Sequence, residues 1–260
     1  MENRSERFSE IIRDYVNTEN IGNTEDTGNT GGKKMIQEQY RKVREKIDLA
    51  CARSGRDPKN VTLIAVSKTK PIEDLHEAYE AGARDFGENK VQEIVQKAPQ
   101  MPEDARFHMI GHLQHNKIRQ VLPHIEMIHS VDSVRLAEYI EKEAQKEERE
   151  VKILLEVNVA KEESKFGFAP EEVEEAVLAI SQMKHLKICG LMTIAPNVEH
   201  PEENRPVFKK LYELSVDIKK KNVDNVSMSV LSMGMTGDYE VAVEEGATMI
   251  RVGTGIFGAR

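Results

Sequence analysis

One lysine is the residue of this sequence whose chemistry and position most directly suggest a ligand site. Lys68 follows the β-branched run at residues 61–66, so it is expected to emerge where a strand ends. Partial burial lowers the pKa of a lysine, and the resulting neutral amine can attack a carbonyl carbon. Spacing alone leaves open that Lys68 is a loop lysine directed at water, and Lys70 is a competitor two residues further on.

Two glycine-rich segments near the carboxyl end could bind an anion. Residues 232–238 read SMGMTGD, and residues 251–258 read RVGTGIFG. Each follows an apolar run, and each offers backbone N–H groups and hydroxyls, at Ser232 and Thr236 in the first and at Thr254 in the second. Either turn alone is weak evidence because glycine-rich turns are common. On adjacent strands the two together predict a phosphate site.

Other candidate motifs carry less chemistry. His108, His112 and His115 lie close in sequence, but His108 falls on a predicted strand and no carboxylate or cysteine pattern accompanies them, so no metal site is expected. Cys51 and Cys189 lack CxxC spacing and are expected to be reduced thiols. Neither GxGxxG nor GxxxxGK[ST] occurs, which disfavours nucleotide binding. No catalytic residue is assigned.

The elements that must position these residues alternate between helix and strand from Met35 onward. Eight short apolar runs are predicted strands, at residues 61–66, 85–87, 106–110, 127–130, 152–158, 187–192, 227–232 and 248–252. Helical patterns lie at 36–55, 133–147, 170–183, 202–221 and 239–246, and the connection after Gly111 is shorter. This α/β alternation predicts a single (β/α)8 TIM barrel, with an open doubly wound sheet as the rival. A barrel would place Lys68 and both glycine-rich segments at the carboxyl ends of its strands, where such folds bind ligands.

Composition limits the class of protein. The chain has 260 residues, 39% hydrophobic and 32% charged, which suits one domain with a sizeable core. A net charge of −8 argues against a general nucleic-acid binder. No run approaches the roughly 20 apolar residues of a membrane-spanning helix, and residues 1–13 lack the apolar segment of a signal peptide. We therefore expect a cytoplasmic protein without nucleic-acid or membrane partners.

The first 34 residues have a different character from the rest. Residues 17–34 are rich in Asn, Thr and Gly and repeat Gly-Asn-Thr, which predicts a flexible linker. Ahead of them, apolar residues at helical spacing within 5–16 predict a short helix, either a docking helix or an inert extension. The predicted organisation is a flexible extension at 1–34 and a barrel at 35–260.

Several segments, in order, resemble the pyridoxal 5′-phosphate (PLP) homeostasis proteins, also called the YggS/PROSC family. They are LIAVSKTKP around Lys68, FGENKVQE, FHMIGHLQHNK, GLMTIAP and the long stretch LSMGMTGDYEVAVEEGATMIRVGTGIFG. The resemblance implies a barrel like the N-terminal domain of alanine racemase, with PLP as cofactor. It implies these site residues: Lys68 for a Schiff base with PLP, Ser232, Gly253 and Thr254 for the phosphate, Arg251 near the pyridine nitrogen, and Asn89 lining the pocket.

The resemblance also implies a function. The chain would hold PLP reversibly and take part in intracellular PLP homeostasis without robust turnover, as a monomer in transient contact with PLP-dependent apo-enzymes. A permanently charged Arg251 would oppose protonation of the ring nitrogen and make PLP a poorer electron sink. Two alternatives stay open. One is a PLP-dependent, amino-acid racemase-like enzyme, and the other is a PLP-free barrel enzyme that uses Lys68 on a phosphorylated metabolite.

Overall fold

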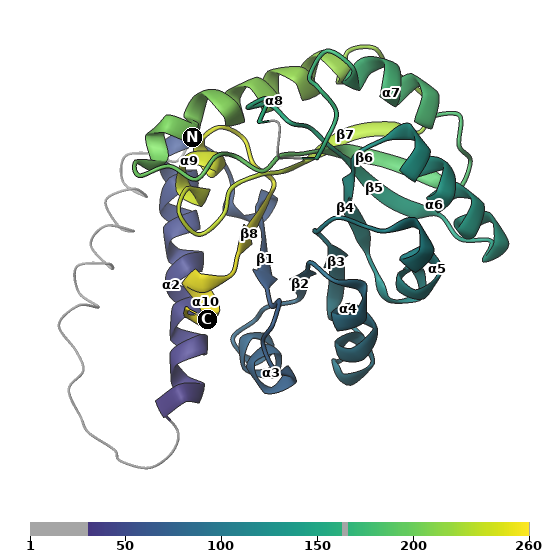
Figure 1. The fold of residues 1–260 in the computed structure, drawn as a ribbon. Helices are drawn as coiled ribbons and strands as arrows, with labels where there is room; N and C mark the ends of the chain where they lie inside the picture. Colours follow the sequence, from purple (N-terminus) through teal and green to yellow (C-terminus); the bar gives the residue numbers. More distant parts are fainter. Residues whose placement is uncertain (1–30, 163–165, 260) are drawn as a thin grey trace, which may run out of the picture.

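Eight parallel strands form a closed barrel in the computed structural model, which describes residues 31–162 and 166–259. Each strand pairs with the next in sequence, and the last pairs with the first (Figure 1). The strands are β1 Thr62–Val66, β2 Asp85–Glu88, β3 Arg106–Met109, β4 Met127–Val131, β5 Val151–Glu156, β6 Leu186–Met192, β7 Val226–Ser232 and β8 Met249–Val252. The predicted TIM barrel and all eight predicted strands are confirmed.

Helices alternate with the strands and cover the outside of the barrel, and the first of them precedes β1 (Figure 1). They are α2 Gly31–Ser54, α3 Ile72–Glu80, α4 Val91–Lys97, α5 Ile118–Val121, α6 Val134–Lys146, α7 Val173–Ile180, α8 Arg205–Lys219, α9 Tyr239–Glu244 and α10 Thr254–Phe257. Short 3-10 turns cover Pro58–Asn60, Ala98–Gln100, His115–Lys117, Leu122–His124 and Pro201–Asn204. The connection after Gly111 is short, as predicted.

The first described helix overlaps the end of the predicted linker. The linker was predicted to run to residue 34, but α2 begins at Gly31, so the last four residues of that segment are helical. The predicted short helix within 5–16 and the rest of the linker lie outside the described residues. The division of the chain at residue 34 therefore stays a prediction.

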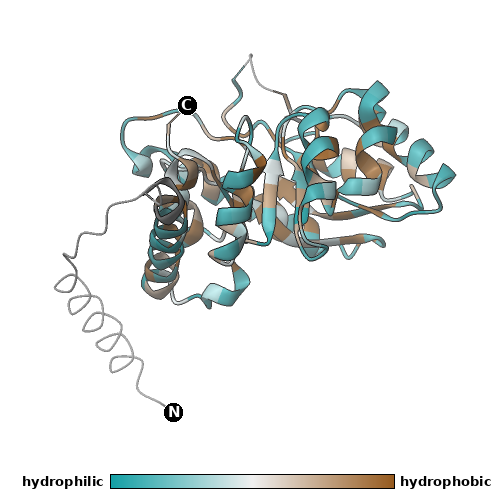
Figure 2. Ribbon diagram, turned by 90° about the horizontal axis from the view of Figure 1, so that it is seen from below, coloured by the Kyte–Doolittle hydropathy of each residue, from teal (hydrophilic) through white to brown (hydrophobic). Residues whose placement is uncertain are grey.

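Amphipathic helices build the main core. In α6, the Ser133 hydroxyl accepts a hydrogen bond from the Leu136 amide and caps the helix, while Leu136, Ile140 and Ala144 are buried on one face. In Figure 2, hydrophobic colour concentrates on the strands, and much of the helical surface is hydrophilic. The largest cluster of buried residues lies between the strands and these helices. Within residues 31–162 and 166–259, no helix is both long and apolar enough to cross a membrane.

Closure of the barrel joins the two ends of the described chain. β1 pairs with β8 from Thr62 opposite Met249 onward, and α2 packs against α9 and α10 (Figure 1). Arg53 of α2 donates to Glu244 at 2.7 Å and to Glu240 at 3.1 Å, both on α9. α9, which follows the first glycine-rich segment, and α10, which lies within the second, are thus supported by a helix from the other end of the domain.

Candidate functional site

The predicted site residues come from strands whose carboxyl ends meet at one end of the barrel. Lys68 follows β1, Asn89 follows β2, Ser232 ends β7, and Gly253 directly follows β8. Because all eight strands are parallel, these positions lie at the same end. The structure therefore brings together, at the expected end, residues that are far apart in the sequence.

The alternation of β1, continued past its last residue Val66, leads us to expect Lys68 to face the barrel mouth. A Cβ added at Gly87 would lie 2.9 Å from Ile64 and 3.5 Å from Val66, so these β1 side chains face into the barrel. Lys68 has the same parity two residues further on and is half-buried. The turn is held by the Ser67 amide on the Gly87 carbonyl and by the Lys70 amide on the Ser67 carbonyl, each at 3.0 Å.

A buried charge cluster supports this turn from behind the barrel wall. The Lys97 ammonium donates to the Ser67 carbonyl, to Glu88 Oε1 and to Glu93 Oε2, each at 2.8 Å. Glu93 Oε2 also accepts the Thr69 amide at 2.7 Å. Thr69 has a φ of 64°, a conformation unusual for a β-branched residue, so this turn needs external support.

Glu88 is the most deeply buried carboxylate of that cluster. It has no exposed surface, and Oε1 accepts from both Lys97 and the Ser67 hydroxyl. Burial raises the pKa of Glu88 to about 7, against the opposing effect of these two donors. Glu88 is therefore near its titration point at neutral pH.

Lys70, the competing lysine, is directed elsewhere. Its ammonium donates to the Phe257 carbonyl of α10 at 2.8 Å. This contact links the turn that carries Lys68 to the segment that follows β8. The amine of Lys70 is thus engaged by backbone at the end of the described chain.

The two glycine-rich segments lie in contact, as the phosphate-site hypothesis requires. The Thr254 hydroxyl donates to the Thr236 hydroxyl at 3.3 Å, and the Gly255 amide donates to the same oxygen at 3.4 Å. Asp238 shapes the first segment, because Oδ1 accepts the Met235 amide at 2.7 Å. Thr236 was named as a hydroxyl donor of the predicted phosphate site, but the family resemblance did not assign it to PLP. Its signal was the hydroxyl in SMGMTGD.

Gly253 connects these segments to the lysine turn. A Cβ added there would lie 3.4 Å from the Val66 carbonyl, so the start of the second segment lies beside the end of β1. Thr254 is exposed and begins α10. The lysine turn and the two hydroxyl-bearing turns therefore form one continuous surface.

Arg251 is held inside the barrel below these turns. It is 5% exposed, Nη2 donates to the Thr193 carbonyl at 2.8 Å, and Nη1 donates to Ser232 Oγ. Burial lowers the pKa of Arg251 to about 10, while Glu156 and Asp238 act in the opposite direction. Arg251 remains a cation at neutral pH. Burial and the charge of Asp132 raise the pKa of the nearby Glu156 to about 7.

Ser232 uses its hydroxyl inside the barrel. It accepts from Arg251 and bonds to His129 Nδ1 at 2.9 Å, and the residue has no exposed surface. Its role as a phosphate ligand stays a prediction. Sequence reasoning did not single out His129, whose only signal was a polar residue on a strand that is otherwise largely apolar.

The three histidines of the FHMIGHLQHNK segment have separate surroundings. His108 bonds Asp85 and His129 inside the barrel, His112 bonds Asp132 at 3.1 Å, and His115 stacks on Tyr139. Within the described part of the chain, no three His, Cys, Asp or Glu residues are grouped as a metal site would require.

Asn89 is half-buried at the end of β2 and is closely packed from one side. A Cβ added at Gly111 would lie 2.6 Å from the Asn89 carbonyl oxygen and 2.7 Å from its Cα. The absence of a side chain at Gly111 thus allows the two loops to touch. A direct contact of Asn89 with a ligand stays a prediction.

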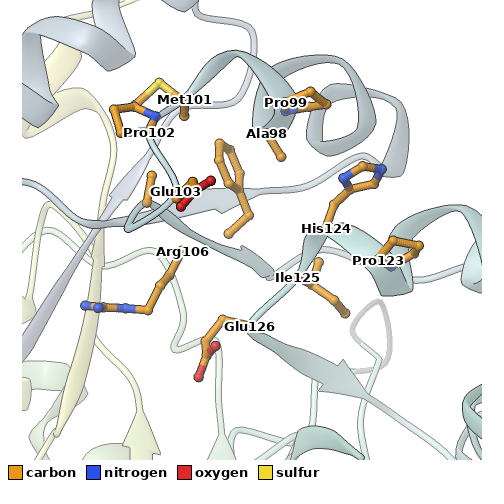
Figure 3. Close-up of a pocket in the computed structure, with 12 residues that line it drawn as sticks. Ala98, Pro99, Met101, Pro102, Glu103, Arg106, Pro123, His124, Ile125 and Glu126 are labelled. Atoms are coloured by element: carbon orange, nitrogen blue, oxygen red, sulfur yellow. The ribbon is translucent and has the colours of Figure 1, made fainter. Parts of the chain in front are cut away.

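A hollow of about 480 Å³ lies at the opposite end, where β3 and β4 begin (Figure 3). Arg106, His124 and Glu126 line it, together with the apolar residues Met101 and Ile125. None of the predicted site residues contributes to it. Arg106 links this end to the barrel interior through a bidentate pair with Asp85, at 2.6 and 2.8 Å.

The chain is similar to known proteins over most of its described length. The family model described as "Alanine racemase, N-terminal domain" matches residues 40–260. The pyridoxal phosphate homeostasis protein of Aquifex aeolicus is 42% identical over 224 residues, which cover 86% of this chain and 97% of that protein. PipY of Synechococcus elongatus, 36% identical, has been solved without PLP and with PLP bound, with TM-scores of 0.77 and 0.74. Both comparisons cover 86% of this chain and 100% of that one.

Proposed function

The chain belongs to the family of pyridoxal phosphate homeostasis proteins, and we propose that it binds PLP and takes part in PLP homeostasis. The observation that carries this proposal is the convergence of one half-buried lysine, one buried arginine and two hydroxyl-bearing turns at one end of the barrel. PLP presents an aldehyde, a ring nitrogen and a phosphate, and each of these has a chemically matched partner there.

The residues present fit the cofactor group by group. We assign the aldehyde to Lys68, whose amine would hold PLP as a Schiff base, with loss of water. The phosphate is assigned to the Gly253–Gly255 turn, with the hydroxyl of Thr254 and that of its neighbour Thr236. Asn89 lines the pocket beside β2. Ser232 was predicted for the phosphate, but its contacts support a place beside Arg251.

Arg251 is assigned to the ring nitrogen. PLP supplies an electron sink when bound, and that sink is strongest when the ring nitrogen carries a proton. Arg251 is a donor only, so it can donate a hydrogen bond to an unprotonated nitrogen and opposes a second positive charge beside it. This environment favours holding PLP over carbanion chemistry, which supports a carrier without robust turnover.

Absorption spectroscopy of the full chain with added PLP tests the proposal. Wild type is expected to show the band of PLP bound to an amine, and Lys68→Ala is expected to lose it. Lys70→Ala is the matched control: it removes a lysine two residues away whose ammonium contacts backbone instead, and it is expected to keep the band.

Two results would count against the proposal. If the wild-type chain shows no such band, the better hypothesis is a PLP-free enzyme that uses Lys68 on a phosphorylated metabolite. A band lost in Lys70→Ala and kept in Lys68→Ala would move the attachment point. The cytoplasmic location, the monomeric state and the contact with apo-enzymes stay proposals. Gel filtration of the PLP-loaded chain tests the second of these.

A further inference from the structure

A continuous row of buried polar side chains crosses the barrel interior below the candidate site. His108 Nε2 lies 3.0 Å from Asp85 Oδ1, and His108 Nδ1 lies 3.0 Å from His129 Nε2. His129 Nδ1 lies 2.9 Å from Ser232 Oγ, which accepts from Arg251. All five residues are at most 7% exposed. The interior of such a barrel is normally filled by apolar side chains, so we asked what this row of polar side chains does.

The two ends of this row fix its direction. Arg251 can only donate. Asp85 is ionised, because hydrogen bonds from His108 and Arg106 outweigh its burial and lower its pKa to about 2, so it can only accept. With one hydrogen on each imidazole ring, the contacts of Ser232, His129 and His108 between this donor and this acceptor can be satisfied in one order only. Ser232 donates to His129 Nδ1, His129 Nε2–H donates to His108 Nδ1, and His108 Nε2–H donates to Asp85.

A second proton on His129 would break this order. His129 Nδ1 would then donate to Ser232, and the serine hydrogen would lose its acceptor. Burial, followed by the electrostatic influence of the neighbouring His108 and Arg251, holds the pKa of His129 well below its ordinary value. Other charged groups face the row at its ends: Arg106 beside Asp85, and Glu156 and Asp238 around Arg251.

We infer that Asp85, His108 and His129 are positioning residues for Arg251, because they orient the Ser232 hydroxyl so that its lone pair faces the guanidinium. The serine hydrogen is committed to His129, so Ser232 acts on the arginine and not on the phosphate. The inference rests on the proposed function to the extent that Arg251 faces the ring nitrogen of PLP. The inference gives a role to Asp85, the first residue of β2, through the contacts that connect it to Arg251.

Titration of the full chain with PLP tests the inference through variants of His129. His129→Phe keeps a ring but removes both hydrogen bonds, so Kd for PLP is expected to rise about tenfold. The pH midpoint of the bound-cofactor band is expected to shift as well, because Arg251 loses its fixed orientation. His129→Gln keeps one acceptor and one donor at a similar separation, and its Kd is expected to stay within about threefold of wild type.

His185→Gln is the matched control. His185 also bonds a carboxylate, Glu141, at 2.9 Å, but it lies outside the barrel interior. It is expected to leave the PLP affinity and the pH profile unchanged. Wild-type behaviour of His129→Phe would overturn the inference, and so would a His129→Gln variant as impaired as His129→Phe, since the ring shape would then matter instead of the polarity.

Nitrogen-15 NMR of the histidines in the cofactor-free wild-type chain separates this inference from the proposed function. It is expected to show the hydrogen of each ring, His108 and His129, on Nε2 at neutral pH. Hydrogen on Nδ1 of either ring would refute the assigned direction even if PLP binds. The expected tautomers without PLP binding would refute the role in the cofactor site and the proposed function together. The NMR result decides the direction even if His129→Phe does not fold.

Discussion

Replacement of Lys97 by methionine is expected to destabilise the barrel and to loosen the turn that carries Lys68. Lys97 is 6% exposed, and its ammonium makes three hydrogen bonds of 2.8 Å, to Ser67, Glu88 and Glu93. Methionine fills a similar volume but leaves Glu88 buried without its counter-charge. Removal of one partner from a buried ion pair costs about 3–5 kcal/mol, and we expect about 4 kcal/mol at pH 8.

The loss of stability should depend on pH in a specific direction. The folded-state pKa of Glu88, about 7, already lies above its usual 4.5, so the stability contribution of this group falls as pH rises from 4.5 to 7. Without Lys97, the pKa of folded-state Glu88 rises further. The stability contribution of Glu88 then continues to fall above pH 7, where in wild type it no longer changes. Because one pH unit of such titration is worth about 1.4 kcal/mol, the deficit should be about 1.4 kcal/mol smaller at pH 6 than at pH 8.

Urea denaturation followed by circular dichroism at both pH values measures this difference. Glu88→Gln added to Lys97→Met should recover part of the stability, because the neutral amide can still accept from Ser67. Lys42→Met is the matched control, since Lys42 has the same i,i+4 pairing, with Glu38, but is exposed, and no measurable change is expected. The reasoning is refuted if the Lys97→Met deficit is the same at both pH values, or as small as that of Lys42→Met.

Two further predictions concern the rim of the site. Glu156→Gln removes a buried carboxylate whose pKa is raised to about 7. The variant should be more stable than wild type by about 3 kcal/mol above pH 7, and the difference should vanish toward pH 4.5. Denaturation at several pH values checks this. Gly111→Ala places a methyl group against the Asn89 backbone and should cost about 1–3 kcal/mol and weaken PLP binding, whereas Gly237→Ala, in open space, should not change the PLP affinity; thermal melts and PLP titration compare them.

Most of the fold could be predicted because its signals are local. Each strand is a short apolar run bounded by polar residues, and the repeated alternation with amphipathic helices leaves few topologies. The amino end of α2 was the exception: a Gly-Gly-Lys-Lys stretch reads as linker, yet it continues the helix. Helix ends of this kind depend on neighbouring packing more than on local composition.

The site was predictable only in part, for a physical reason. Lys68 and the glycine-rich turns could be predicted because their residue types are informative and they directly follow predicted strands. The cluster behind Lys68 does not, because Lys97 lies on an amphipathic helix where a lysine normally faces solvent. The partners of His129 also come from different strands, and only the closed barrel brings their side chains within hydrogen-bond distance.

Closure of the ring makes the candidate site a late product of folding. The contact between Lys70 and Phe257 joins residues 187 positions apart, and β1 meets β8 over a similar separation. A contact of such long range forms only after a loop of most of the chain has closed, which costs conformational entropy. The lysine turn and the Gly253 turn therefore meet only when the last strand, β8, pairs with β1. A ligand that spans both turns binds the closed ring alone. By mass action, such a ligand stabilises the closed barrel against unfolding by RT ln(1 + L/Kd), where L is its free concentration.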